Sequence, residues 1–250
     1  MYNVYALDDK GVMGVMENMI NELIVAQRPE YGKGNEPEFR DACSYPFIPM
    51  QIKRLITVFS TLKQVLPKVK EWSGNRKGHH DTKFLDAGCG IGNVMVAARS
   101  CGLARKYHGI EYFDETYDQA VEWLGLNRRN SFIYKLFKDD ILTFPNYGEY
   151  DIIYYYCPFC DKNLQQRFEE YLEDEMKEGA LLLAFLKQSR TVTKDYRFKA
   201  IEGIPGAEHV FLKTKEGPRK TSHSLSNKEM LTSSTFTEQR NVYIEKYKMV

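Results

Sequence analysis

Residues 84–93, FLDAGCGIGN, decide the fold of this chain. The first half of the stretch is a short apolar run typical of a buried strand. The second half carries Gly88, Gly90 and Gly92 with the spacing G-x-G-x-G. Glycines after a first strand let the backbone turn sharply and let a ligand approach the main chain closely. Glu111 closes the next predicted strand, where an acid can accept hydrogen bonds from ribose hydroxyls, so the pattern predicts a nucleotide-like ligand.

From residue 83 onward, strand-like apolar runs alternate with helix-like segments. Strands are predicted at 83–88, 107–111, 132–137, 150–157 and 180–187, with two more at 209–214 and 241–247. Helices are predicted to begin at Asn93 and after Asp114 and Asp161, with the two aspartates as N-caps. The alternation predicts an α/β fold: a Rossmann-like, mostly parallel seven-strand sheet flanked by helices. The last two strands would join it as an antiparallel addition.

The first 70 residues are predicted to form an N-terminal helical extension or lid, and residues 71–250 the ligand-binding domain. Helices are expected at 12–26 and from residue 52, both with apolar residues at amphipathic spacing. A polar, turn-rich connection follows at 70–82. It contains His79-His80-Asp81, but no second cluster has zinc-like spacing, so no metal site is predicted.

The composition sets limits on partners and location. Lys plus Arg is 35 and Asp plus Glu is 34, so a net charge of +1 gives no chain-wide attraction for nucleic acid. No apolar run approaches the length of a membrane span, and the N-terminus lacks a signal-peptide pattern. Five cysteines, an odd number, argue against a disulfide framework and predict a cytoplasmic protein without a membrane partner.

The region 212–250 is locally basic. It carries eight Lys or Arg against four Glu, a local charge of +4. A solvated linker is the favoured interpretation, and a contact for RNA, DNA or an acidic protein is the alternative.

Asp86 helps to choose among nucleotide-like ligands. Dinucleotide sites favour G-x-G-x-x-G and a pyrophosphate, which a carboxylate directly ahead of the loop would repel. S-adenosylmethionine carries an ammonium and a sulfonium, so Asp86 suits it better. Asp139-Asp140 ends the third predicted strand, where a carboxylate can accept a hydrogen bond from an adenine amino group.

The segments FLDAGCGIGN, GIE, KDDIL and CPF together resemble a class I, seven-strand S-adenosylmethionine-dependent methyltransferase over roughly residues 45–187. The resemblance implies a glycine loop around the methionine part of the cofactor, an acid on the ribose and an acid near adenine. The cofactor-binding residues would be Asp86, Gly88, Cys89, Gly90, Gly92, Asn93, Glu111, Tyr112, Asp140 and Ile141.

The segment after the fourth strand would face the transferable methyl group. Methyltransferases that act on base amino groups often have Asp/Asn-Pro-Pro-Tyr/Phe here, whereas this chain has Tyr156, Cys157, Pro158 and Phe159, which are assigned to the catalytic pocket. Cys157 supplies no strong acceptor. Lysine methyltransferases with seven strands are also similar to this chain, and the loop SYPFIP (44–49) resembles the segment that covers substrate in them. Tyr45 and Phe47 are therefore predicted to contact the acceptor.

The acceptor stays open at this point: a protein side chain such as lysine, a nucleic acid or a small molecule. Two other functions also stay open. Cys157 and Cys160 form a C-x-x-C pair at a strand-to-helix junction, which would suit a thiol- or NAD-dependent oxidoreductase. A catalytically silent module that binds S-adenosylmethionine is the other alternative. The sequence does not predict an oligomeric state.

Overall fold

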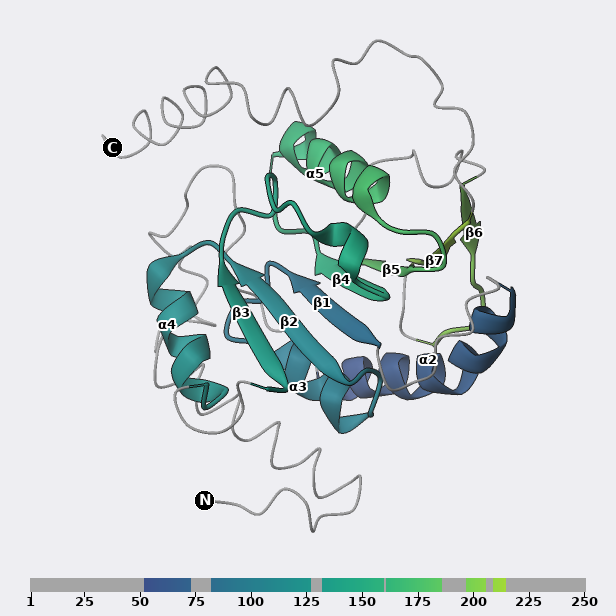
Figure 1. Ribbon diagram of the computed structural model, residues 1–250, viewed down its shortest axis with the longest axis horizontal. Coiled ribbons are helices and arrows are strands. Elements are labelled where there is room, and N and C mark those ends of the chain that lie inside the picture. The colour runs from purple at the N-terminus through teal and green to yellow at the C-terminus, as the bar shows by residue number, and fades with distance from the viewer. Residues whose placement is uncertain are drawn as a thin grey trace.

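The computed structural model describes residues 52–72, 82–126, 132–159, 161–185, 197–205 and 209–214 of the 250. In this part of the chain a seven-stranded sheet forms the centre (Figure 1). The strands are β1 (Lys83–Ala87), β2 (Lys106–Glu111), β3 (Tyr134–Lys138), β4 (Ile152–Tyr156), β5 (Leu181–Phe185), β6 (Phe198–Ala200) and β7 (His209–Lys213). Their spatial order is β3-β2-β1-β4-β5-β7-β6.

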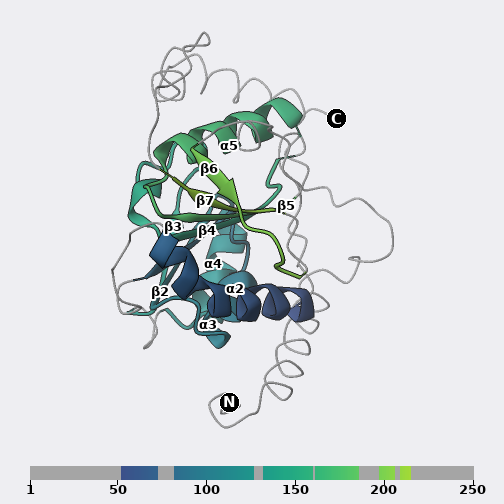
Figure 2. The same cartoon turned by 90° about the vertical axis from the view of Figure 1, so that its right-hand side faces the viewer.

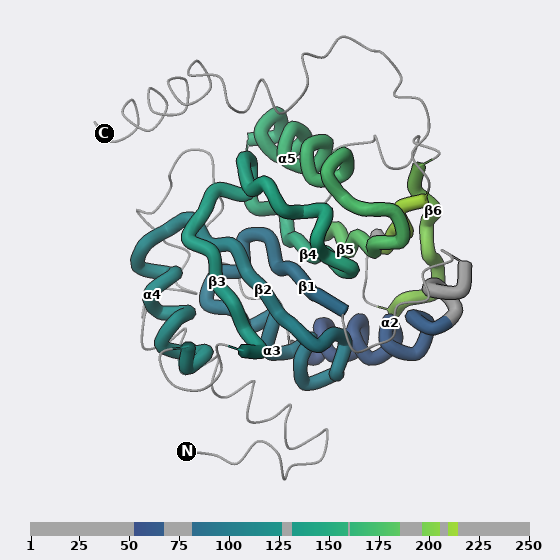
Figure 3. The backbone as a smooth tube through the Cα atoms, viewed as in Figure 1, coloured from purple at the N-terminus to yellow at the C-terminus, as the bar shows by residue number. Residues whose placement is uncertain are grey.

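The pairing confirms the predicted fold class. Strands β1 to β5 pair in parallel, and β7 joins β5 antiparallel. The strand predicted at 209–214 is therefore an antiparallel addition as expected. On its other side β7 pairs with β6, a strand that the sequence did not predict. The segment 241–247, predicted as the last strand, lies outside the described residues. The path of the chain through the sheet can be followed in Figure 3.

Helices cover both faces of the sheet, which explains why its strands are apolar on both sides. Helices α2 (Ile52–Trp72), α3 (Asn93–Ser100) and α4 (Asp114–Trp123) pack on one face, and α5 (Lys162–Glu175) packs on the other (Figure 2). Successive strand residues point to opposite faces. Phe84 accordingly joins the core under α2 and α3, whereas Leu85 joins the core under α5.

Helix α2 belongs to the first of these cores. Its buried residues Leu55, Phe59 and Leu62 recur at helical spacing, and the ring of Phe59 meets that of Phe84 edge-on at 5.8 Å. The helix predicted from residue 52 is thus present, and it continues beyond the proposed boundary at residue 70. The remainder of the proposed extension, including the helix at 12–26, lies outside the described residues.

The predicted N-caps differ in outcome. Asp161 caps α5, because its carboxylate accepts hydrogen bonds from the backbone N–H groups of Asn163 and Leu164 at 2.8 and 2.9 Å. The prediction for Asp114 is wrong by one residue. Phe113 occupies the N-cap position, and Asp114 is the first helical residue. A carboxylate in the first turn still interacts favourably with the positive end of the helix dipole.

None of the helices in the described ranges is long and apolar enough to cross a membrane.

We expect Gly109→Ala to destabilise the fold. A Cβ at position 109 would lie 2.6 Å from Cys89 Sγ and 2.8 Å from Cys89 Cβ, so the glycine loop would have to shift. Overpacking of this kind costs about 1–3 kcal/mol, measurable as a fall in the free energy of unfolding in urea. Because Cys89 is the obstacle, the cost should shrink when Gly109→Ala is combined with Cys89→Gly. An equal cost in both backgrounds would contradict this packing.

Candidate functional site

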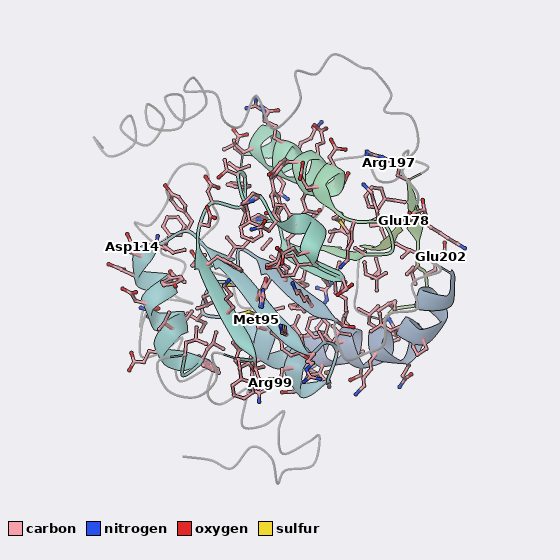
Figure 4. All side chains as sticks on the ribbon, viewed as in Figure 1. Met95, Arg99, Asp114, Glu178, Arg197 and Glu202 are labelled. Carbon is pink, nitrogen blue, oxygen red and sulfur yellow. The ribbon has the colours of Figure 1, made fainter. Side chains whose placement is uncertain are left out.

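The loop between β1 and α3 lies at the carboxyl ends of the parallel strands. Asp114, labelled in Figure 4, follows β2 and marks this end of the strands, whereas Glu178 and Arg197 come directly before β5 and β6 in the chain and belong to the amino ends of those strands. Strand order reverses between β1 and β4, and open α/β sheets bind ligands beyond the strand ends at such a switch point. The predicted cofactor loop and the segment after β4 are the two connections that leave this point.

The three loop glycines are required by the backbone. Gly88, Gly90 and Gly92 have φ values of 84°, 54° and 85°, in the left-handed region that side chains disfavour. The loop turns back onto β2, because the N–H groups of Gly88 and Cys89 both donate to the Ile110 carbonyl at 3.0 and 2.9 Å. The sequence therefore predicted the position of this loop after the first strand and its sharp turn.

Glu111 fixes the loop from the end of β2. One carboxylate oxygen accepts from the Gly90 N–H and the other from the Phe113 N–H, both at 2.9 Å. The side chain is buried, and burial raises the pKa of Glu111 while the N–H groups of Phe113 and Gly90 oppose that shift. Each carboxylate oxygen has two lone pairs, so both can also accept a ligand hydroxyl. The sequence predicted the ribose role but not this anchoring role.

Asp86 is a buried carboxyl group beside the loop. It lies in β1 with 1% of its surface exposed, and its Oδ2 has no hydrogen-bond partner among the described residues. Burial raises the pKa of Asp86 well above its ordinary value, and the nearby Glu111 charge raises it further. A buried polar atom without a partner is costly and rare in folded proteins, which makes Asp86 Oδ2 a candidate ligand contact.

Asn93 presents a complementary group. It is the first residue of α3 and is 1% exposed, and within the described ranges its Nδ2 has no hydrogen-bond partner. The first N–H groups of a helix also lack partners within the helix and favour anions. A buried acceptor at Asp86 and a buried donor at Asn93 therefore flank the glycine loop. This pair fits the ammonium and carboxylate of an amino-acid head group.

Tyr112 and Phe113 follow Glu111 and are partly exposed. Their rings meet edge-on at 5.5 Å, and 41% of Tyr112 and 37% of Phe113 remain accessible. Lys138 Nζ lies 5.4 Å from the centre of the Tyr112 ring and pairs with Asp114 at 2.9 Å. The end of β2 thus offers an aromatic surface that a planar ring could contact.

Asp139 and Asp140 form the turn after β3. Asp140 N–H donates to Asp139 Oδ1 at 2.8 Å, and Asp140 Oδ1 accepts from the Leu142 N–H at 3.0 Å. Burial raises the pKa of Asp139, and Ile141 is buried behind the turn. The Asp139 N–H also bonds the Glu111 carbonyl at 3.2 Å, which brings the predicted adenine and ribose positions together.

The segment after β4 meets the glycine loop. A Cβ built on Gly88 would lie 3.5 Å from Pro158 Cβ, an ordinary contact distance. Cys157 has a φ of 27°, the one positive value at a non-glycine residue in the described ranges, and its N–H donates to the Phe185 carbonyl at 3.2 Å. The ring of Tyr156 is half-buried and stacks on Phe185 at 6.1 Å.

Phe159 lies in the core. It is 5% exposed, and its ring meets that of Phe168 at 6.0 Å, so little of it is left to line a pocket. The Cys157 thiol is also 5% exposed and contacts the Phe159 carbonyl at 3.7 Å. The other predicted acceptor residues, Tyr45 and Phe47, lie outside the described residues, as does Cys160.

Methyltransferases are among the solved structures with a similar arrangement of elements. An RNA methyltransferase from Salinibacter ruber, in complex with S-adenosyl-L-homocysteine, is 17% identical with a TM-score of 0.42; the match covers 64% of this chain and 97% of that one. Magnesium protoporphyrin IX methyltransferase from Synechocystis, with bound S-adenosylmethionine, is 13% identical with a TM-score of 0.43. That match covers 84% of this chain and 99% of the other.

No protein-family model matches the chain, and no curated protein matches it in sequence. At these identities and TM-scores the likeness concerns the fold alone. Within the described ranges, no group of three His, Cys, Asp or Glu side chains is placed to hold a metal ion.

Sequence reasoning missed Gln165 in α5. Its side chain is fully buried and its Oε1 accepts a hydrogen bond from the Phe159 N–H at 3.1 Å. The sequence pattern that could have indicated this residue is the spacing of Gln165, Glu169 and Glu173. At i, i+4 and i+8 they lie on one face of the helix. Polar residues on the buried face of a helix need specific partners.

The raised pKa of Asp86 predicts how stability depends on pH. The folded protein keeps the Asp86 proton to a higher pH than the unfolded chain, in which Asp titrates near 3.9. Stability is therefore full below that value and falls as pH rises toward the raised folded pKa. Urea unfolding over this range should show the fall in the wild type and a shallower one in Asp86→Asn. Equal slopes would contradict a raised pKa of Asp86 in the folded protein.

Proposed function

We propose that the protein is a methyltransferase that uses S-adenosylmethionine. The observation that supports this most directly is a pair of buried atoms on either side of the glycine loop, Asp86 Oδ2 and Asn93 Nδ2, which have no hydrogen-bond partner among the residues that the structure describes. A buried acceptor and a buried donor suit a zwitterionic amino acid. A pyrophosphate would instead meet the Asp86 carboxyl group, which disfavours a dinucleotide in the same loop.

The residues around the loop fit each part of this cofactor. Asp86 would accept from the ammonium, and Asn93 with the N-terminus of α3 would donate to the carboxylate. Glu111, already held by two backbone N–H groups, would accept from the ribose hydroxyls. Asp140, with Ile141 and the exposed Tyr112, would surround adenine.

The chemistry asks the protein mainly for placement. When bound, S-adenosylmethionine supplies an electrophilic methyl group on a sulfonium. Pro158 lies beside the glycine loop and the half-buried Tyr156 ends β4 just ahead of it, so these two residues would orient an acceptor and exclude water from it. The structure assigns no general base, and we propose none.

For the acceptor, a protein side chain such as lysine, a nucleic acid and a small molecule all remain candidates. Cys157 stands where base-amino methyltransferases have Asn or Asp, and it is buried with its thiol directed at a backbone carbonyl. This favours an acceptor other than a base amino group. Within the N-terminal extension 1–70, the part that precedes α2, with Tyr45 and Phe47, is proposed as the lid over the acceptor, and the cytoplasm as the location.

Calorimetry with S-adenosylhomocysteine tests cofactor recognition. The wild type should bind it, and Asp86→Asn should weaken binding about 10- to 100-fold, because a hydrogen bond to a charged group contributes about 1.5–3 kcal/mol. The matched control is 5′-methylthioadenosine, which has the adenosine but lacks the amino-acid head. Its affinity should be the same in both proteins. An equal loss for both ligands would contradict the proposed role of Asp86.

The alternative functions predict different outcomes. Binding of NADH without binding of S-adenosylhomocysteine would overturn the proposal in favour of an oxidoreductase. Transfer of a labelled methyl group to fractions of a cell lysate would support catalysis and reveal the acceptor class. Cofactor binding with no transfer to protein, nucleic acid or small molecules would instead favour a silent binding module.

A further inference from the structure

Two hydrogen bonds hold the loop Cys157-Pro158-Phe159, called the acceptor loop below. At its start, the Cys157 N–H donates to the Phe185 carbonyl of β5 at 3.2 Å. At its end, the Phe159 N–H donates to Gln165 Oε1 of α5 at 3.1 Å. Pro158 has no N–H to contribute. The side chain of Gln165 is therefore one direct tie between the far end of this loop and α5.

The neighbour of Gln165 fixes the orientation of its amide. Gln165 Nε2 donates to Glu169 Oε1 at 2.8 Å, and both side chains are fully buried. A carboxylate can only accept and a backbone N–H can only donate. Only one amide orientation satisfies both neighbours: the nitrogen faces Glu169 and the oxygen faces Phe159. Glu169 thus aims the acceptor atom of Gln165 at the loop.

Burial of the Gln165 side-chain amide costs free energy that an apolar side chain at this position would not cost. The surrounding buried residues of α5, Phe168 and Leu172, belong to an apolar core, where a polar side chain is favourable only with its hydrogen bonds made. The ring of Phe168 also meets that of Phe159 at 6.0 Å. One stretch of α5 therefore holds both the backbone and the ring of Phe159.

The loop needs such restraint because its backbone is strained. Cys157 has a φ of 27°, and a non-glycine residue in a sparsely populated region costs about 1–3 kcal/mol and persists only where its surroundings hold it. Release of Phe159 would let the strain relax. Pro158, whose Cβ would lie 3.5 Å from a Cβ built on Gly88, would then leave the glycine loop.

We propose that Gln165 is a positioning residue that holds the acceptor loop against the glycine loop. In terms of the methyltransferase function proposed above, on which this role rests, it sets the surface where the acceptor meets the methyl group. Gln165 acts through the Phe159 N–H and touches no reacting atom.

The test compares Gln165→Met with Gln166→Met. Gln166 is a matched control, because it makes the same i, i+4 hydrogen bond to Glu170 at 2.8 Å on the exposed side of the helix. The readout is the rate at which iodoacetamide alkylates Cys157, followed by peptide mass spectrometry, since the Cys157 thiol is buried only while the loop is held. Gln165→Met should raise this rate at least 10-fold, and Gln166→Met should leave it unchanged.

Cys89 separates loop release from general unfolding. It is 2% exposed in the glycine loop and should react at the wild-type rate in both variants. A parallel rise at Cys89 would mean that the whole domain opens and would overturn the proposal. So would a wild-type rate at Cys157 in a Gln165→Met protein whose circular dichroism is native.

Gln165→Glu supplies a readout that simple loss of packing would not change. It keeps an oxygen for the Phe159 N–H but places a second carboxyl group against Glu169, so the buried pair must share a proton. Tyr155 on β4 interacts electrostatically with Glu169, with Glu173 on the same helix and with Cys157 in the loop, so these groups lie near the pair. Cys157 alkylation, relative to wild type at each pH, should be near normal at low pH and increase as pH rises. A ratio that does not change with pH would contradict the proposal.

Affinity for S-adenosylhomocysteine distinguishes this proposal from the proposed function. Gln165→Met should bind it within about 3-fold of wild type, because Asp86, Asn93 and Glu111 are unchanged. If the wild type fails to bind, the methyltransferase proposal fails, while alkylation still decides whether Gln165 holds the loop.

Discussion

The two hydrogen bonds that Glu111 accepts, from Gly90 and from Phe113, are the interaction on which the rest of the site depends. They join the glycine loop to the end of β2 through a buried carboxylate. The loop itself is set by three left-handed glycines, and Asp86 and Asn93 lie at its two ends. A shift of the Glu111 carboxylate would therefore move the groups that face the amino acid and the ribose together.

Several polar groups of the site are buried at a cost in free energy that a bound ligand would reduce. Asp86 and Glu111 are both buried, and burial raises the pKa of each. Asp86 Oδ2 and Asn93 Nδ2 lack partners in the described part of the chain. A cationic ammonium near Asp86 and an anionic carboxylate near Asn93 would remove both costs. Residues that weaken the fold when no ligand is bound are those expected to contribute binding free energy.

Much of the fold and half of the site could be predicted because they depend on local signals. The apolar strand runs, the glycine positions and the acid at a strand end specify β1, β2 and the glycine loop that follows β1. β6 was not predicted because it has only three residues, of which one, Phe198, is buried. So short a segment shows no alternation of buried and exposed residues. The prediction placed the N-cap of α4 at Asp114 instead of Phe113, because a carboxylate is favourable both at the N-cap and at the first helical position. Gln165 depends on a contact with Phe159 that sequence spacing does not reveal.

A crystal structure of the complex with S-adenosylhomocysteine would locate the cofactor relative to Asp86, Asn93 and Glu111. We expect the ligand ammonium within hydrogen-bond distance of Asp86 Oδ2, its carboxylate at Asn93 Nδ2, and its ribose hydroxyls on Glu111. A ligand bound elsewhere, or bound at this loop with the amino-acid head directed away from Asp86, would contradict this expectation.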